Sequence, residues 1–167
     1  MKKVVSNTSP LIALSMIEQF PLLFRLFQKV YVPKAVNREM IESKSVHEYG
    51  KKELQDAVNR NEVTIYTVQN AMLVEQLYGK MHRGGLEVIV AAKELSLELL
   101  LIDERTARNF AEMNLLTPIG TIGLLVAAKK RGFIDALKPY LDLLMERGFR
   151  INRDIYISLL RTVGELK

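Results

Sequence analysis

The chain has 167 residues, which suits one domain of ordinary size, and 49% of them are hydrophobic while 26% are charged. This balance excludes a disordered chain and leaves enough apolar surface for one core. Lysine and arginine outnumber aspartate and glutamate by 24 to 19, and the resulting net charge of +5 favours a polyanionic partner. The sequence contains no cysteine and 2 histidines, which excludes disulfides, thiolate metal sites and a histidine-built zinc site.

The amino-terminal segment lacks the apolar core of a signal peptide, and no stretch reaches the ~20 apolar residues of a membrane span. We therefore expect a cytoplasmic protein with no membrane partner. Internal repeats and low-complexity segments are also absent from the sequence. These features predict a single domain over residues 1–167, in which residues 135–167 form a helical carboxy-terminal extension that closes the same core.

Strand-like and helix-like patterns alternate along the first half of the chain. Runs of β-forming residues predict strands at Val4–Ser6, Val30–Val32 and Val63–Val68. The first predicted helix begins at Pro10 with Ser9 as its N-cap, because proline is preferred in the first turn and serine just before it. Further helical segments are predicted over residues 22–27, 33–43 and 47–60.

The second half continues this alternation more clearly. A helix over residues 72–81 ends at Gly84–Gly85, and a helix over residues 86–97 is apolar nearly all round, which predicts burial. The apolar run Leu99–Ile102 is typical of a parallel strand covered on both faces, and a short strand follows at Thr117–Ile119. The remaining helices are predicted over residues 104–114, 122–130, 135–146 and 154–166.

These patterns together predict the α/β class. Alternating strands and helices give right-handed crossovers and a mostly parallel sheet. The expected architecture is a three-layer α/β/α domain whose central sheet has about five strands. The strands are expected near Val4, Val30, Val63, Leu100 and Ile119.

Open parallel sheets bind ligands beyond the carboxyl ends of their strands. This rule selects residues that directly follow the first, fourth and fifth predicted strands, which are Asn7, Thr8, Ser9, Asp103, Glu104 and Thr121. No G-x-G-x-x-G motif follows the first strand, and no phosphate-cradling loop precedes Gly79–Lys80. A dinucleotide-dependent enzyme and a P-loop NTPase are therefore disfavoured.

Three acidic residues stand in unusual settings. Asp103 ends the buried strand, Glu87 begins the apolar helix, and Glu39 lies between apolar residues in the helix opened by Pro33. Acids that converge on one cleft repel each other unless a cation lies between them, and Mg²⁺ or Mn²⁺ held by carboxylates can activate water for phosphodiester hydrolysis.

Each candidate also has a purely structural interpretation. Asn7 suits a turn, Asp103 suits the cap of the helix that follows it, and the helix dipole alone favours Glu87. Glu39 taken alone suits a solvated helix surface. Spacing in the sequence does not join these residues into one site.

A resemblance to a known family joins them. Five segments resemble the PIN domain, in particular its small stand-alone prokaryotic members, and lie within about Val4 to Phe149: Val4–Ile12, Val32–Glu39, Gly84–Lys93, Leu99–Arg108 and Ile119–Leu125. The resemblance implies a nuclease-like fold that binds Mg²⁺ or Mn²⁺ and cuts RNA. It also implies that homodimers are common and that many relatives are toxins of toxin–antitoxin pairs.

Carried over by position, the resemblance implies a catalytic and metal-binding site of Asn7, Glu39, Glu87 and Asp103. Thr8, Ser9, Glu104 and Thr121 are secondary candidates, and Arg83, Arg105 and Arg108 are candidates for steering single-stranded RNA. Asn7 departs from the family, which most often has aspartate there. The first hypothesis is therefore a metal-dependent endoribonuclease, for which the resemblance implies a role as the toxin of a toxin–antitoxin pair. The second is a catalytically weakened PIN-like module that binds RNA or protein.

Overall fold

The structure is a computed structural model that describes residues 2–42 and 49–167. Its five strands are β1 (Lys2–Ser6), β2 (Phe27–Pro33), β3 (Val63–Tyr66), β4 (Leu99–Leu101) and β5 (Thr117–Ile119). They form one parallel sheet in the order β3-β2-β1-β4-β5. The predicted five-stranded parallel sheet is confirmed, as is the three-layer α/β/α class.

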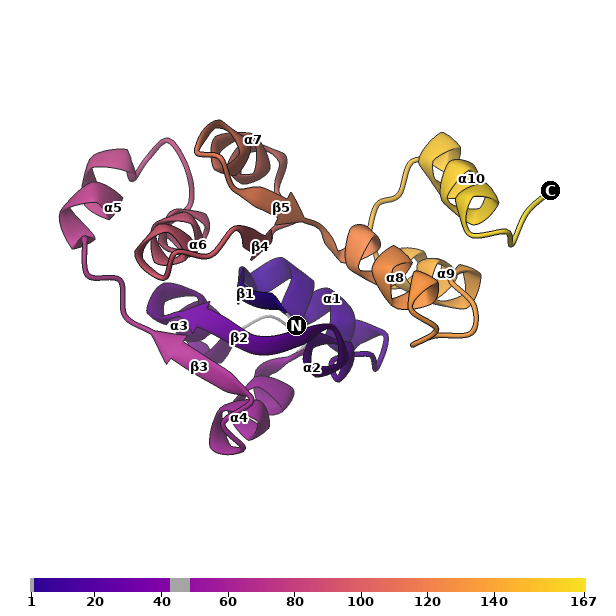
Figure 1. The fold of residues 1–167 in the computed structure, drawn as a ribbon, viewed down its shortest axis with the longest axis horizontal. Coiled ribbons are helices and arrows are strands. Elements are labelled where there is room, and N and C mark those ends of the chain that lie inside the picture. Colours follow the sequence, from indigo (N-terminus) through magenta and orange to yellow (C-terminus); the bar gives the residue numbers. More distant parts are fainter. Residues whose placement is uncertain (1, 43–48) are drawn as a thin grey trace.

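Helices connect successive strands. In chain order they are α1 (Thr8–Met16), α2 (Leu22–Leu26), α3 (Lys34–Glu42), α4 (Lys51–Asn59), α5 (Ala71–Leu77), α6 (Arg83–Glu94), α7 (Arg105–Met113), α8 (Thr121–Lys130), α9 (Lys138–Glu146) and α10 (Arg153–Thr162). The helices α5, α6 and α7 lie on the opposite side of the sheet from α2 and α4 (Figure 1). None of the helices in the described ranges has the length and apolar character that a membrane crossing needs.

The direction of the winding reverses between β1 and β4. From β1 the chain moves outward to β2 and β3, and then it crosses back to β4 and continues outward to β5. Neighbouring parallel strands with connections on opposite faces leave a crevice at their carboxyl ends. The residues that follow β1 and β4 are therefore placed together at the position where such sheets bind ligands.

The buried core explains these elements. Every residue of β4 is buried, as are Val4 and Val5 of β1 and residues 84–92 of α6. The prediction that the apolar helix and the run Leu99–Ile102 are buried is confirmed. The carboxy-terminal helices α9 and α10 add Leu141, Leu144 and Leu160 to the same core cluster.

Two local predictions are wrong. The helix α1 begins at Thr8 rather than Pro10, and its N-cap is Asn7 rather than Ser9, because the Asn7 Oδ1 atom accepts a hydrogen bond of 2.9 Å from the Thr8 N–H. The pair Gly84–Gly85 does not separate two helices, because α6 begins at Arg83 and runs through both glycines. Of the predicted segments 33–43 and 47–60, residues 43–48, including His47, lie outside the described residues.

Candidate functional site

Asn7 and Asp103 follow the neighbouring strands β1 and β4 at the point where the winding reverses. The Asn7 N–H donates a hydrogen bond of 2.9 Å to the carbonyl oxygen of Leu101, so the chain after β1 stays attached to β4. Asp103 follows two residues after Leu101 and is half-buried. This places both predicted residues at the carboxyl edge of the sheet, as expected from the rule for parallel sheets.

Glu39 reaches the same edge from α3. The Thr8 hydroxyl donates a hydrogen bond of 2.8 Å to Glu39 Oε2. A Cβ atom built on Gly84 would lie 3.2 Å from Asn7 Oδ1 and 3.3 Å from Glu39 Oε2. Both oxygens therefore face the first turn of α6 at a point where the chain has no side chain. Asn7, Thr8, Glu39 and Gly84 form what we call the oxygen cluster.

Asp103 is held by the start of α8. The Thr121 N–H donates to Asp103 Oδ1 at 2.7 Å, and the Thr121 hydroxyl donates to Oδ2 at 2.6 Å. The helix α8 has no side-chain cap from its own N-cap residue Gly120, so Asp103 supplies this cap from the neighbouring strand. A carboxylate has about four acceptor positions, so two remain for a further ligand.

Gly120 and Arg108 lie close to that carboxylate. A Cβ atom on Gly120 would lie 2.8 Å from Asp103 Oδ1. This distance is too short for a real side chain, so any residue other than glycine would displace Asp103. The Arg108 Nη1 atom lies 3.1 Å from the position of that Gly120 Cβ atom. It also donates a hydrogen bond of 3.1 Å to the carbonyl oxygen of Ile102. The guanidinium of Arg108, predicted to steer RNA, therefore lies beside Asp103.

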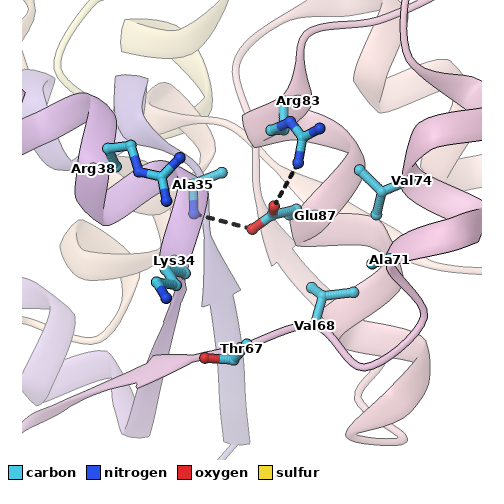
Figure 2. A pocket seen from close by; sticks show the side chains of 9 residues that line it. All are labelled: Lys34, Ala35, Arg38, Thr67, Val68, Ala71, Val74, Arg83 and Glu87. Atoms are coloured by element: carbon cyan, nitrogen blue, oxygen red, sulfur yellow. Dashed lines mark hydrogen bonds and ion pairs between the residues drawn. The ribbon is translucent and has the colours of Figure 1, made fainter.

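Glu87 lies in a different setting from the oxygen cluster. Its side chain is almost buried, and its Oε2 atom accepts a hydrogen bond of 3.0 Å from the Ala35 N–H at the start of α3. Its Oε1 atom lies 3.8 Å from Arg83 Nη1. Figure 2 shows Glu87 between α3 and α6, with the side chains of Lys34, Arg38 and Arg83 around it.

Those residues line a cavity of about 200 Å³ that we call the basic pocket. Its basic members are Lys34, Arg38 and Arg83, and its remaining lining residues are Ala35, Thr67, Val68, Ala71, Val74 and Glu87. Arg83, predicted to steer RNA, is also ion-paired with Glu75 and lies over the Tyr78 ring at 5.4 Å from the ring centroid. Lys34 and Arg38 were not among the residues predicted from the sequence, although they lie four residues apart after Pro33 and therefore on one helix face.

The other secondary candidates lie around this edge. Thr8 and Thr121 are buried and make the contacts described above, whereas Ser9 and Glu104 are exposed. Glu104 precedes α7 as its N-cap without a side-chain capping bond, and Arg105 begins that helix with an exposed side chain. The interpretation of Asp103 as a cap is correct in kind, but the capped helix is α8 rather than the one that follows it.

The donor set of the oxygen cluster suits a hard divalent cation. Mg²⁺ and Mn²⁺ prefer oxygen ligands, and they commonly take one or two protein carboxylates together with water and phosphate. The amide oxygen of Asn7 and the carboxylate of Glu39 meet this requirement, with Asp103 on the next strand. No group of three histidine, cysteine, aspartate or glutamate side chains that could hold a metal occurs within residues 2–42 and 49–167. The four-residue metal site stays a prediction.

The comparison with protein families agrees with this geometry. A family model described as "PIN domain" matches residues 3–165. The chain is a PIN-domain protein. The resemblance predicted from the sequence is thus confirmed over almost the entire chain, and the PIN domain is a nuclease-type fold. No curated protein and no solved structure shows significant similarity to this PIN-domain chain.

Proposed function

We propose that this PIN-domain protein is a metal-dependent endoribonuclease that hydrolyses phosphodiester bonds of single-stranded RNA. One observation carries the proposal: Asn7 Oδ1 and Glu39 Oε2 converge over Gly84 beside the strand that leads to Asp103. This convergence occurs at the reversal point of a nuclease-type fold, where ligands of parallel sheets bind. The net charge of +5 supports a polyanionic substrate.

Mg²⁺ or Mn²⁺ would be held by Asn7 and Glu39, and Asp103 would contribute from the neighbouring strand. When bound, such a cation activates water and neutralises charge on the scissile phosphate. The protein contributes orientation. The Thr8 hydroxyl fixes the Glu39 carboxylate, and Thr121 fixes Asp103 through two hydrogen bonds. Groups that are already positioned lose little entropy when the substrate binds.

Arg108 and Arg105 would attract the RNA backbone. Arg108 lies beside Asp103, where its positive charge can stabilise a phosphate close to the carboxylates. Arg105 lies one turn earlier on the same helix with its side chain in solvent, which suits a weaker and strongly salt-dependent contact.

The experiment that tests this proposal is cleavage of a labelled single-stranded RNA with Mg²⁺, with Mn²⁺ and with a chelator. We expect cleavage only with the cations, and a loss of about 100-fold or more in Asp103→Asn and Glu39→Gln, the scale seen when one electrostatic group is removed from a site. The matched control is Glu98→Gln, since Glu98 is exposed and lies before β4, at the other edge of the sheet. Cleavage in the chelator, or full activity in Asp103→Asn, contradicts the proposal.

One observation favours a second candidate, a PIN-domain module that binds RNA or protein without cutting. Position 7 has an amide where the resemblance implies a carboxylate, and a unit charge about 4 Å from a cation is worth about 4 kcal/mol in an effective dielectric near 20, before desolvation. Calorimetric titration with Mn²⁺ separates the two candidates. If only Asn7→Asp binds the ion, the native protein is a binding module.

The proposal also concerns the oligomeric state, the protein partner and the cellular role of the chain. A homodimer, an antitoxin partner and a toxin role remain predictions of the resemblance, and a cytoplasmic location remains a prediction of the sequence. Light scattering of the purified chain tests the dimer, and growth after induced expression in a bacterial host tests the toxin role. Growth arrest that persists in Asp103→Asn would contradict a toxin that acts by RNA cleavage.

A further inference from the structure

We propose that the basic pocket binds a backbone phosphate of single-stranded RNA, one that is distinct from the phosphate cleaved at the oxygen cluster. This inference rests on the proposed function, because it assigns a second contact to the same substrate. It names Lys34, Arg38 and Arg83 as the residues that hold this phosphate.

The first argument is position. Lys34 directly follows β2 and Thr67 directly follows β3, so the pocket lies at the same carboxyl edge of the sheet as the oxygen cluster. Helix α3 connects the two, since Lys34 and Arg38 line the pocket while Glu39 reaches Thr8 in the cluster. One RNA strand that crosses this edge can contact both.

The second argument is charge. Three cationic side chains line the pocket together with one carboxylate, and Oε2 of that carboxylate is already bound to the Ala35 N–H. Within the described part of the chain, neither Lys34 nor Arg38 has an ion pair or a side-chain hydrogen bond, and both are exposed. Arg83 is paired with Glu75 and Glu87, so Lys34 and Arg38 are the two cations whose mutual repulsion an anion between them would remove. The same charges disfavour a divalent metal ion in this pocket.

The third argument is shape. The cavity of about 200 Å³ holds a phosphate group with several waters, since one water occupies about 30 Å³ of liquid. Val68, Ala71 and Val74 form an apolar wall along one side of the cavity, while Lys34 and Arg38 lie at its solvent-exposed side.

The wall is also anchored. The carboxylate of Glu94 accepts hydrogen bonds from the N–H groups of Gln69 and Asn70, at 2.8 to 3.1 Å, and from the Tyr66 hydroxyl at 2.9 Å. These contacts tie the segment after β3 to helix α6. The residues Thr67 and Val68 that face the pocket are therefore held in place before a ligand arrives.

The test measures binding of a short single-stranded RNA in EDTA, over a range of salt concentrations, for wild type and for Lys34→Gln/Arg38→Gln. The salt slope for single strands falls by about 0.7 for each phosphate contact that is lost, so we expect a decrease of about 0.7 in the double variant. The matched control is Lys2→Gln/Lys3→Gln, which removes the same charge from exposed positions on β1 at the amino edge of the sheet. We expect its slope to stay at the wild-type value.

Equal decreases in both double variants, or no decrease in either, would overturn the inference, because general attraction would then explain binding. An effect on inorganic phosphate binding alone, with RNA binding unchanged, would also overturn it, because the pocket would then take a free anion. Thermal denaturation of each variant checks folding. Cleavage is a separate readout: a wild-type chain that binds RNA through the pocket but never cleaves it with Mn²⁺ refutes the proposed nuclease and leaves the phosphate site standing.

Discussion

Replacing Gly84 by alanine tests the proposed cation site between Asn7 and Glu39. The new Cβ would lie 3.2 Å from Asn7 Oδ1 and 3.3 Å from Glu39 Oε2, which is closer than such atoms normally approach. Neither oxygen is free to retreat without cost, because Asn7 Oδ1 is bound to the Thr8 N–H and Glu39 Oε2 to the Thr8 hydroxyl. We therefore expect the two ligand oxygens to be displaced by a few tenths of an ångström or to lose these bonds.

The substitution should change stability little but weaken metal binding clearly. Alanine is favoured over glycine by about 1 kcal/mol inside a helix, and a weakened hydrogen bond costs about 1 kcal/mol, so the net change in the free energy of unfolding should be small. A displaced ligand pair should weaken Mn²⁺ binding by tenfold or more, which corresponds to about 1.4 kcal/mol. Urea denaturation and calorimetric titration with Mn²⁺ measure the two quantities.

Gly85 provides the matched control in the next position. A Cβ there would lie 3.4 Å from Ala107 Cβ and 4.0 Å from Asn7 Nδ2, which are ordinary contact distances. We expect Gly85→Ala to gain up to about 1 kcal/mol of stability and to keep the Mn²⁺ affinity of the wild type. Unchanged Mn²⁺ affinity and RNA cleavage in Gly84→Ala would show that the cation does not bind between Asn7 and Glu39.

Three further substitutions separate structural from functional roles. Thr121→Val removes the hydroxyl donor to Asp103, so the free energy of unfolding measured with urea should fall by about 1–3 kcal/mol and RNA cleavage should decrease. Unchanged stability and cleavage would show that Thr121 does not position Asp103. Glu87→Gln keeps an acceptor for the Ala35 N–H, so the free energy of unfolding should change by less than about 1 kcal/mol. Because the substitution removes the negative charge of the basic pocket, RNA affinity at low salt should rise severalfold. Lost cleavage with unchanged RNA affinity would instead support Glu87 as a metal ligand. Burial of the Glu165 carboxyl would raise its pKa, but backbone N–H groups at the start of α9 and a nearby lysine lower it overall. The stabilisation by Glu165 should therefore be present above about pH 4.3 and lost as the pH falls through the lower folded-state pKa, and Glu165→Gln should flatten this part of the stability–pH curve.

The sequence was sufficient for the sheet and for two of the positions at its edge. β-branched and apolar runs predict the strands because such residues pack on a pleated surface, and Asn7 and Asp103 were selected because they directly follow two of them. Thr121 was selected by the same rule, but its contact with Asp103 could not be predicted, since the two lie 18 residues apart and meet only through the pairing of β4 with β5. That contact depends on tertiary structure.

The start of α6 was mispredicted for a physical reason. A pair of glycines ordinarily ends a helix because glycine loses more backbone conformational entropy than other residues when it becomes helical. Here small size is what matters, because Gly84 faces the oxygens of the cluster and Gly85 packs against Ala107. Lys34 and Arg38 were missed for another reason, since two cations four residues apart are equally typical of a solvated helix face.

Helix α3 links the two parts of the proposed site, and Glu87 fixes where that helix begins. The Ala35 N–H is bound to Glu87 from α6, so the first turn of α3 cannot shift without breaking a hydrogen bond to an almost buried carboxylate. Lys34 precedes that bond, and Glu39 follows it by one turn. Because Lys34, Arg38 and Glu39 lie on this one helix, the geometry of α3 sets the spacing between the basic pocket and the oxygen cluster. In the proposed nuclease that spacing would set the separation between the phosphate that is held and the bond that is cut.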